Sequence, residues 1–128
     1  MSDTEKVSFN ISVVDLGKID LLAEQGFYSS RTDFIRTAIR NLMATHSEVV
    51  QESVTRRLMV VGVVVYGRNG LERTQAEGKQ LEINVVGLVA LGKDVSPELA
   101  RATIRSIQVF GVLRASDEVK EALADRIK

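Results

Sequence analysis

The first pattern in the chain is a strict alternation of apolar and polar residues near the amino terminus. Between residues 5 and 15, apolar Val7, Phe9 and Ile11 are separated by single polar residues. Successive side chains of a strand point to opposite faces, so this alternation predicts a strand with one buried face. A lone strand of about six residues would have two unpaired edges, so we expect it to pair with the same strand of a second copy.

Two amphipathic helices are predicted to follow this strand. From Val14 to Gln25 apolar residues recur at helical spacing, and Gly26 supplies a natural stop. The second helix is predicted to begin near Ser30, whose side chain can cap it, while Asp33 reaches back in a shortened capping box. Its continuous apolar stripe consists of Phe34, Ile35, Ala38, Ile39, Leu42 and Met43.

Taken together, KVSFNIS, LLAEQGF and SSRTDFIRTAIRNLM resemble the ribbon-helix-helix DNA-binding superfamily of CopG-like and Arc/Met-type repressors, over residues 5–46. The most specific part runs from Gly26 to Arg36, where a glycine, an aromatic and a short polar run precede an arginine, a threonine, an acid and then Phe-Ile-Arg. The resemblance implies an α+β fold in which two intertwined chains form a two-stranded antiparallel ribbon covered by four helices.

The resemblance also implies how double-stranded DNA would be bound. A two-stranded ribbon fits the major groove, where its outward polar side chains read base edges. By position the base-reading residues would be Lys6, Ser8 and Asn10. The first turn of the second helix would face phosphates, and the phosphate-binding residues would be Ser30, Arg31, Thr32 and Arg36.

These assignments have plainer alternatives. Ser8 and Asn10 could be solvated residues on a surface strand, and Arg36 and Arg40 could simply keep the polar side of the helix soluble. The outer face of the ribbon holds a single cation, Lys6, where related proteins often carry several. We therefore expect modest affinity for each dimer.

The pattern changes beyond residue 46. Residues 1–46 form the predicted DNA-binding domain, residues 47–57 fit a helical connector, and residues 58–128 fit a small α/β domain. Three segments of this last part share one pattern: MVVGVVVYG around Gly62, NVVGLVALG around Gly87 and QVFGVLRAS around Gly111. The glycines are 25 and 24 residues apart, which predicts repeated units with equivalent strands stacked side by side, either within one chain or in a sheet completed between chains.

Three connections complete this second half. A helix capped by Ser96, with Pro97 as its first residue, is predicted between the second and third strands, which should therefore be parallel. Its apolar members are Leu99, Ala102, Ile104 and Ile107. The polar, glycine-rich GRNGLERTQAEGKQ is predicted to be a loop or a mobile arm. A terminal helix follows Ser116, with apolar members Val119, Leu123 and Ile127.

The repeated strands are apolar on both faces, so burial between subunits is expected. We predict that residues 58–128 join dimers into a tetramer or a longer array, or receive a signal from an effector that the sequence does not identify.

Composition limits the function classes. The 128 residues carry 17 basic and 17 acidic side chains, so a generic basic footprint for nucleic acid is missing, and DNA binding would depend on placed contacts and dimerisation. The absence of cysteine excludes disulfides and thiolate metal sites and fits a cytoplasmic setting. The most apolar stretch, Leu58 to Tyr66, is too short for a membrane helix, so we expect no membrane partner.

Candidate catalytic chemistry is sparse. The sequence offers no nucleophile with a partnered base and no carboxylate pair in an apolar setting, so no enzyme activity and no cofactor is expected. His46 is the only histidine, which disfavours metal sensing. The GRNG segment lacks the Lys-Ser/Thr of a phosphate loop.

The leading hypothesis is a homo-oligomeric, sequence-specific transcriptional regulator, acting as a repressor. One alternative is an antitoxin, although its toxin-binding segment would more often be polar and disordered than rich in valine. Another is a scaffold or polymer-forming protein, in which the repeated strands carry the function and the amino-terminal dimer nucleates assembly. Salt-dependent DNA binding would separate the first hypothesis from the last.

Overall fold

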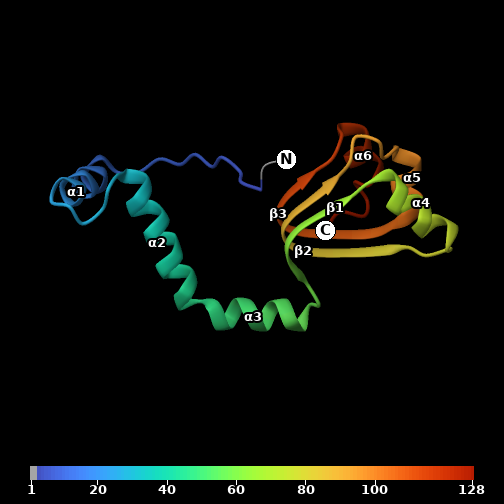
Figure 1. The fold of residues 1–128 in the computed structure, drawn as a ribbon, viewed down its shortest axis with the longest axis horizontal. Coiled ribbons are helices and arrows are strands. Elements are labelled where there is room, and N and C mark those ends of the chain that lie inside the picture. Colours follow the sequence, from blue (N-terminus) through green and yellow to red (C-terminus); the bar gives the residue numbers. More distant parts are fainter. Residues whose placement is uncertain (1–2) are drawn as a thin grey trace. The chain divides into compact units, whose positions relative to one another are not determined.

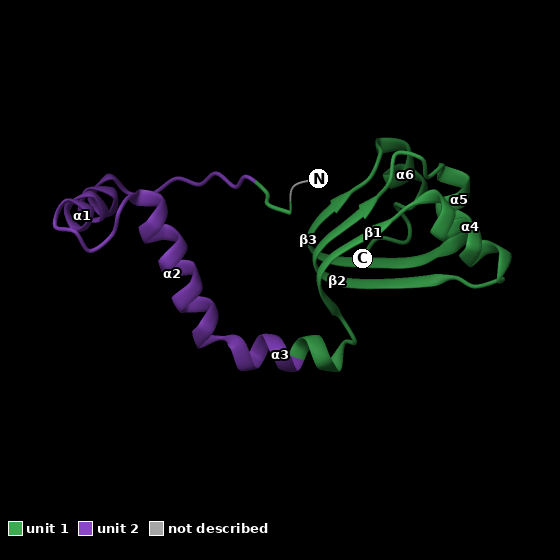
Figure 2. Ribbon diagram, viewed as in Figure 1, with its two compact units in different colours: residues 1–5, 53–128 green, residues 6–52 purple. Residues whose placement is uncertain are grey.

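The computed structural model describes residues 3–128, which fall into two compact units (Figure 2). We call residues 6–52 the N-terminal unit, and residues 3–5 together with 53–128 the C-terminal unit. The N-terminal unit holds α1 (Val13–Glu24), α2 (Arg31–Thr45) and most of α3 (Ser47–Arg56) (Figure 1). Residues 4–12 precede α1 without helix and without a strand partner in the single chain.

Helix α1 begins one residue earlier than the sequence pattern predicts. The Ser12 side chain accepts a hydrogen bond from the Asp15 backbone N–H at 3.0 Å, so Ser12 is the N-cap and Val13 the first helical residue. Gly26 stops the helix as predicted. Its φ of 87° is a conformation that favours glycine, and the Phe27 N–H returns to the Leu22 carbonyl at 3.0 Å.

The predicted cap of α2 at Ser30 is confirmed, with a change of detail. The Ser30 hydroxyl oxygen accepts from the Asp33 N–H at 3.0 Å. Asp33 reaches back one residue further than a capping box would, because its carboxylate accepts from the Ser29 N–H at 3.0 Å. Helix α2 ends at Thr45, with His46 as its C-cap, and residues 47–56, within the predicted helical connector, form α3.

The C-terminal unit is built on three parallel strands in the order β1 (Val60–Tyr66), β2 (Leu81–Leu91) and β3 (Ile104–Arg114). Gly62 pairs with Gly87, and Gly87 pairs with Gly111, so the three repeated glycines lie side by side across the sheet. The predicted stacking of equivalent strands is therefore confirmed.

The glycine row fixes the shape of the sheet. The φ values of Gly62, Gly87 and Gly111 are 142°, 135° and 127°, where only glycine is comfortable, and the strands are strongly bent (Figure 1). A Cβ atom on Gly87 would overlap the carbonyl oxygen of Gly62, and one on Gly111 would overlap that of Gly87. Glycine is thus required at positions 87 and 111 for close backbone approach as well as for backbone conformation.

The connection between β1 and β2 contradicts the sequence-based prediction. The predicted loop contains a helix, α4 (Arg68–Ala76), and Leu71 is its one buried residue. Gly67 occupies the N-cap without contributing a side-chain hydrogen bond. Burial of Leu71 in the core therefore holds a helix that local propensity disfavours.

The helix between β2 and β3 is shorter than predicted. Helix α5 (Pro97–Thr103) begins at Pro97 behind the Ser96 cap, but it ends before Ile104 and Ile107, which belong to β3. Leu81 pairs with Ile104 whereas Glu82 pairs with Ser106, so Arg105 is an extra residue in β3. This bulge places Ile104 and Ile107 both in the core and produces the three-residue spacing that imitated a helix.

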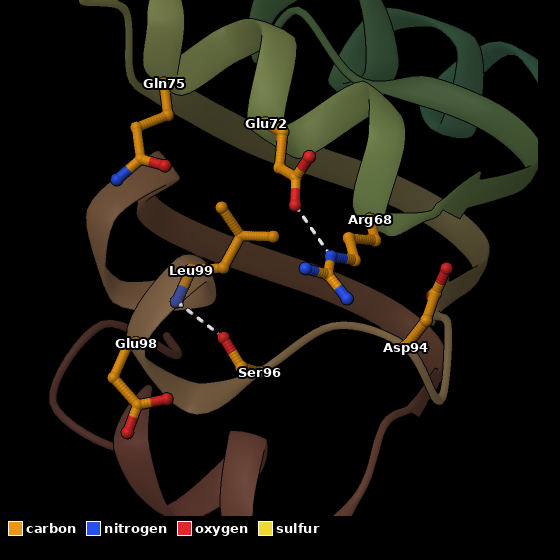
Figure 3. Close-up of a pocket in the computed structure, with 7 residues that line it drawn as sticks. All are labelled: Arg68, Glu72, Gln75, Asp94, Ser96, Glu98 and Leu99. Atoms are coloured by element: carbon orange, nitrogen blue, oxygen red, sulfur yellow. Dashed lines mark hydrogen bonds and ion pairs between the residues drawn. The ribbon is translucent and has the colours of Figure 1, made fainter.

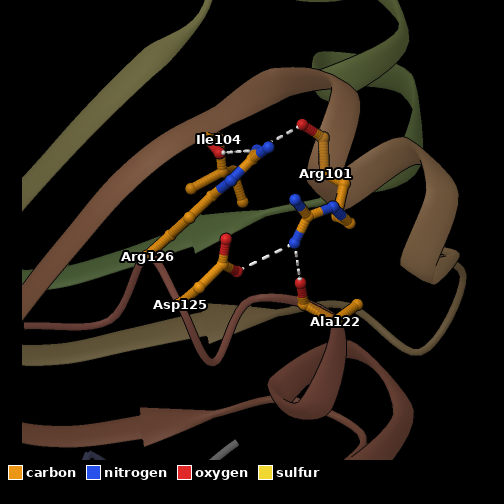
Figure 4. A network of polar contacts seen from close by, with 5 residues as sticks. All are labelled: Arg101, Ile104, Ala122, Asp125 and Arg126. Atoms are coloured by element: carbon orange, nitrogen blue, oxygen red, sulfur yellow. Dashed lines mark hydrogen bonds and ion pairs between the residues drawn. The ribbon is translucent and has the colours of Figure 1, made fainter.

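The carboxyl terminus also departs from its predicted helix. Helix α6 (Asp117–Ala122) ends early, and Ile127 instead pairs with Ile107 on the outer edge of β3. In Figure 4, the guanidinium of Arg101 donates to the Ala122 carbonyl and pairs with Asp125 at 2.9 Å. Arg126 donates to the carbonyls of Arg101 and Ile104. These contacts lay the last residues along β3 and close part of that edge.

Helices α4, α5 and α6 contribute to one core on one face of the sheet. The core cluster consists of Leu71, Ile83, Val85, Val89, Leu91, Val95, Leu99, Ala100, Ile104, Ile107, Val119 and Leu123. We call the opposite face the open face. There Val61, Val63 and Val65 of β1 are 65%, 51% and 59% exposed, and Phe110 is 48% exposed. The expectation of strands apolar on both faces is confirmed.

Candidate nucleic-acid interface

The predicted base-reading residues lie on the unpaired segment before α1. Lys6, Ser8 and Asn10 are exposed, and within the described chain no hydrogen bond or ion pair holds their side chains. The alternating apolar residues are exposed as well, with Val7 77% and Phe9 63% accessible. Both faces of this segment are therefore available, one polar and one apolar.

The helices that follow do not close a core in the single chain. Ile19 is the one residue of the described N-terminal unit that is fully buried. Ile39, Leu42 and Met43, on the predicted apolar stripe of α2, are more than half exposed. So much exposed apolar surface on a unit of this size is typical of a surface that packs against a partner.

The first turn of α2 is a candidate phosphate contact. Because Ser30 satisfies the Asp33 N–H, the unused donors of this turn are the backbone N–H groups of Arg31 and Thr32. The Ser30 hydroxyl accepts with its oxygen and keeps its own proton to donate. Thr32 is exposed beside these groups. The turn therefore presents several donors at the positive end of a helix dipole.

The Arg31 side chain is already engaged inside the N-terminal unit. Its Nε and Nη2 atoms donate to the two carboxylate oxygens of Asp20 on α1, at 2.8 and 2.9 Å. This hydrogen bond lowers the pKa of Asp20 and raises that of Arg31. The two-point pair joins α1 to the start of α2 and fixes the corner between them.

Asp20 is the site residue that sequence reasoning missed. An acid on the polar side of a predicted helix is usually solvated, and the eleven-residue separation from Arg31 follows no local rule. A second contact at the same corner is the edge-to-face packing of Tyr28 on Phe34, whose ring centroids are 5.0 Å apart.

Within residues 3–128, the other two arginines of α2 are not held in an ion pair of the kind that Arg31 makes with Asp20. Arg36 is exposed, and in the described residues its side chain has no hydrogen-bond or ion-pair partner. Arg40 lies one turn further on and makes a long hydrogen bond of 3.4 Å to the Thr37 hydroxyl. Arg36 is therefore an exposed arginine of α2 whose guanidinium is not engaged within the described residues.

The C-terminal unit contains a polar cavity of about 590 Å³, where β1 and β2 lead into their helices (Figure 3). Arg68 pairs with Glu72 at 2.6 Å, and this contact raises the pKa of Arg68. Asp94 and Glu98 add two carboxylates to the lining, while Ser96 is occupied in capping α5. Arg68 and Glu72 are largely exposed and satisfy one another locally.

Two further features concern metals and membranes. Among residues 3–128, no group of three or more histidine, cysteine, aspartate or glutamate side chains is placed to hold a metal ion. No helix in that range is both long enough and apolar enough to cross a membrane.

Comparison with protein families decides the identity. The model of the ribbon-helix-helix transcriptional regulator family matches residues 2–120. The chain belongs to this family. The match extends well beyond the residues 5–46 that carry the resemblance in the sequence, and it includes all three repeated strands. No curated protein and no solved structure matched the chain. Membership of this family places the protein among transcriptional regulators and adds no sign of an enzyme.

Proposed function

We propose that the protein is a sequence-specific DNA-binding repressor in which residues 7–12 of two chains pair as an antiparallel ribbon. The observation that carries this proposal is the state of the N-terminal unit, whose strand segment and helices leave their apolar sides uncovered. Antiparallel pairing of two copies would turn Val7, Phe9 and Ile11 toward the helices. The same pairing would turn Lys6, Ser8 and Asn10 outward, toward the major groove.

In this proposal the start of α2 anchors the ribbon on the DNA backbone. The free N–H groups of Arg31 and Thr32, the Ser30 hydroxyl and the Arg36 guanidinium bind phosphate oxygens. The Arg31 side chain has a different role from the one its position suggests. Held by Asp20, it fixes the angle at which α2 presents its first turn.

Replacement of Asn10 tests the base-reading role. An asparagine that makes a paired contact to adenine contributes about 1–3 kcal/mol of discrimination. Asn10→Ala should therefore weaken binding to a specific site by roughly 5- to 150-fold for each adenine that is no longer recognised, while the thermal unfolding midpoint stays unchanged. Asn69→Ala is the matched control, because Asn69 is an exposed asparagine of α4 in the C-terminal unit. Equal losses of binding and stability in Asn10→Ala would indicate a role in folding instead.

We further propose that the C-terminal unit joins dimers through the outer edge of β1. Residues 126–128 close part of the outer edge of β3, but the outer edge of β1 has no strand partner within the described residues. The sequence of β1, VVGVVVY, contains none of the charges or prolines that usually protect an exposed edge. Two copies of β1 related by a two-fold axis would form a closed interface.

Sedimentation tests this second proposal. Val65→Lys places a charge on the 59% exposed position of β1 and should reduce a tetramer to a dimer at micromolar concentration. Gln75→Lys, on the exposed side of α4, is the control and should leave assembly unchanged. A wild-type protein that sediments as a strict dimer would refute the proposal.

The antitoxin alternative gains no support, because the C-terminal unit has a packed core instead of a disordered segment.

A further inference from the structure

The open face of the sheet carries a segment from the other end of the chain. Residues 3–5 group with the C-terminal unit, although residues 6–52, which follow directly, form the N-terminal unit. Arg114, near the end of β3, donates from Nη2 to the Thr4 carbonyl at 3.0 Å. The same guanidinium nitrogen lies 3.8 Å from the Glu5 carboxylate. Two consecutive residues of the amino-terminal segment thus meet one arginine, across 110 positions of sequence.

The surface beneath this segment is hollowed at the glycine row. A cavity of about 290 Å³ has residues 3–5 as one wall and Gly62, Gly87, Val63, Leu88 and Val112 among its other lining residues. The glycines have no side chains to fill this cavity, and their positive φ values bend the sheet at this point. The result is an apolar hollow that runs across the strands.

The single charged residue of the open face indicates which kind of peptide segment the hollow can bind. Three in-register rows lie on the open face around the glycines: Val61–Val86–Phe110, Val63–Leu88–Val112 and Val65–Ala90–Arg114. Arg114 is the one charged residue in these rows, and its side chain is 31% exposed. A partly buried guanidinium beside apolar residues favours a backbone carbonyl together with a carboxylate. An extended acidic segment such as Asp3-Thr4-Glu5 supplies both.

We propose that the open face is a docking surface for the amino-terminal segment of the same chain, with Arg114 as its anchor. Lys6, the first of the proposed base-reading residues, directly follows the docked segment. Docking therefore tethers the start of each ribbon strand to the repeated sheet, and it gives the C-terminal unit a physical connection to the proposed DNA-reading segment. The docking does not depend on whether the ribbon reads DNA.

Paramagnetic labelling tests this proposal on the full chain. The protein has no cysteine, so Asp3→Cys creates a single site for a nitroxide label. In methyl-labelled protein, the nitroxide should strongly broaden the methyl signals of Val61, Val63 and Leu88. Arg114→Ala in the labelled background should abolish most of this broadening. The matched control Arg105→Ala should preserve it, because Arg105 is an exposed arginine of the same strand that faces Glu82 at 3.6 Å.

A mixing experiment identifies which chain supplies the segment. NMR-silent chains carrying the nitroxide are mixed with methyl-labelled chains without it and refolded together. Docking within one chain predicts that the broadening disappears in the mixture. Broadening that persists there would overturn the proposal, because the segment would then come from a partner. Absence of broadening in the singly labelled protein, or broadening that survives Arg114→Ala, would overturn it equally.

Discussion

The glycine row gives the most demanding prediction for the fold, the effect of Gly87→Ala. At this position φ is 135°, and a Cβ atom would overlap the Gly62 carbonyl oxygen and lie 3.1 Å from its carbonyl carbon. Gly62 is the matched control. Its φ is 142°, yet a Cβ there would meet nothing within 4 Å. The two alanine variants therefore share the cost of the backbone conformation and differ in the steric cost.

The magnitudes follow from these two terms. A non-glycine residue in such a conformation costs about 1–3 kcal/mol, which is the expected loss of unfolding free energy in Gly62→Ala. Forcing extra atoms into packed surroundings adds about 1–3 kcal/mol, so Gly87→Ala should lose roughly 2–6 kcal/mol in total. That is a large part of the stability of an ordinary domain, about 5–15 kcal/mol.

Urea unfolding followed by far-UV circular dichroism, at one fixed protein concentration, measures both losses. Gly111→Ala should behave like Gly87→Ala, since its Cβ would overlap the Gly87 carbonyl oxygen in the same way. Equal losses in Gly62→Ala and Gly87→Ala would refute the argument from close strand approach. A variant Gly87→Ala as stable as the wild type would refute the backbone argument as well.

The remaining predictions concern the N-terminal unit. Gly17→Ala should raise the unfolding free energy by up to about 1 kcal/mol, because Gly17 lies within α1 with no atom near its missing Cβ, and thermal unfolding would show it. The hydrogen bond from Arg31 lowers the pKa of Asp20 from 3.8, so the pair stabilises the fold above that pH and loses its contribution as the pH falls through the lowered value. Asp20→Asn should therefore be less stable than the wild type at pH 7, with a difference that shrinks in acid; a pH-independent difference would count against the pair. Arg36→Ala should weaken DNA binding similarly for all sequences and reduce the salt slope by about one, as measured by anisotropy at several salt concentrations.

Local signals in the sequence predicted two helix ends of the N-terminal unit correctly. The Ser30 cap and the Gly26 stop are determined by residues within a few positions of each other, and the structure shows both. The glycine repeat predicted that equivalent strands lie side by side, because nearly equal spacing favours equivalent residues in register. The parallel direction followed only for the second and third strands, from the helix predicted between them. In each case the determining contacts are either local or repeated.

Other elements depend on contacts that no local pattern reveals. Helix α4 exists because Leu71 is buried in the core, although the segment from Gly67 to Gln80 that contains it is polar and rich in glycine. The bulge at Arg105 alters the spacing of the core residues of β3, so Ile104 and Ile107 resemble one face of a helix. Ile127 pairs with Ile107 and is not helical, because hydrogen bonds from Arg101 to the Ala122 carbonyl and from Arg126 to the Ile104 carbonyl hold the terminal residues along β3.

The candidate site shows the same division. The positions of Lys6, Ser8 and Asn10 follow from the resemblance, and the structure leaves them exposed and unengaged in the described chain. The pairing of Arg31 with Asp20 could not be predicted, because it depends on how α1 and α2 pack at their corner.

The central claim is that the amino-terminal segments of two chains read DNA together. Its most direct test is a fluorescence-anisotropy titration of the wild-type protein against DNA from upstream of its own gene, with a scrambled duplex as competitor, at two salt concentrations. The account predicts selective binding that weakens steeply as salt rises, because phosphate contacts release counterions. Absence of binding at low salt, or equal binding to both duplexes, would contradict it.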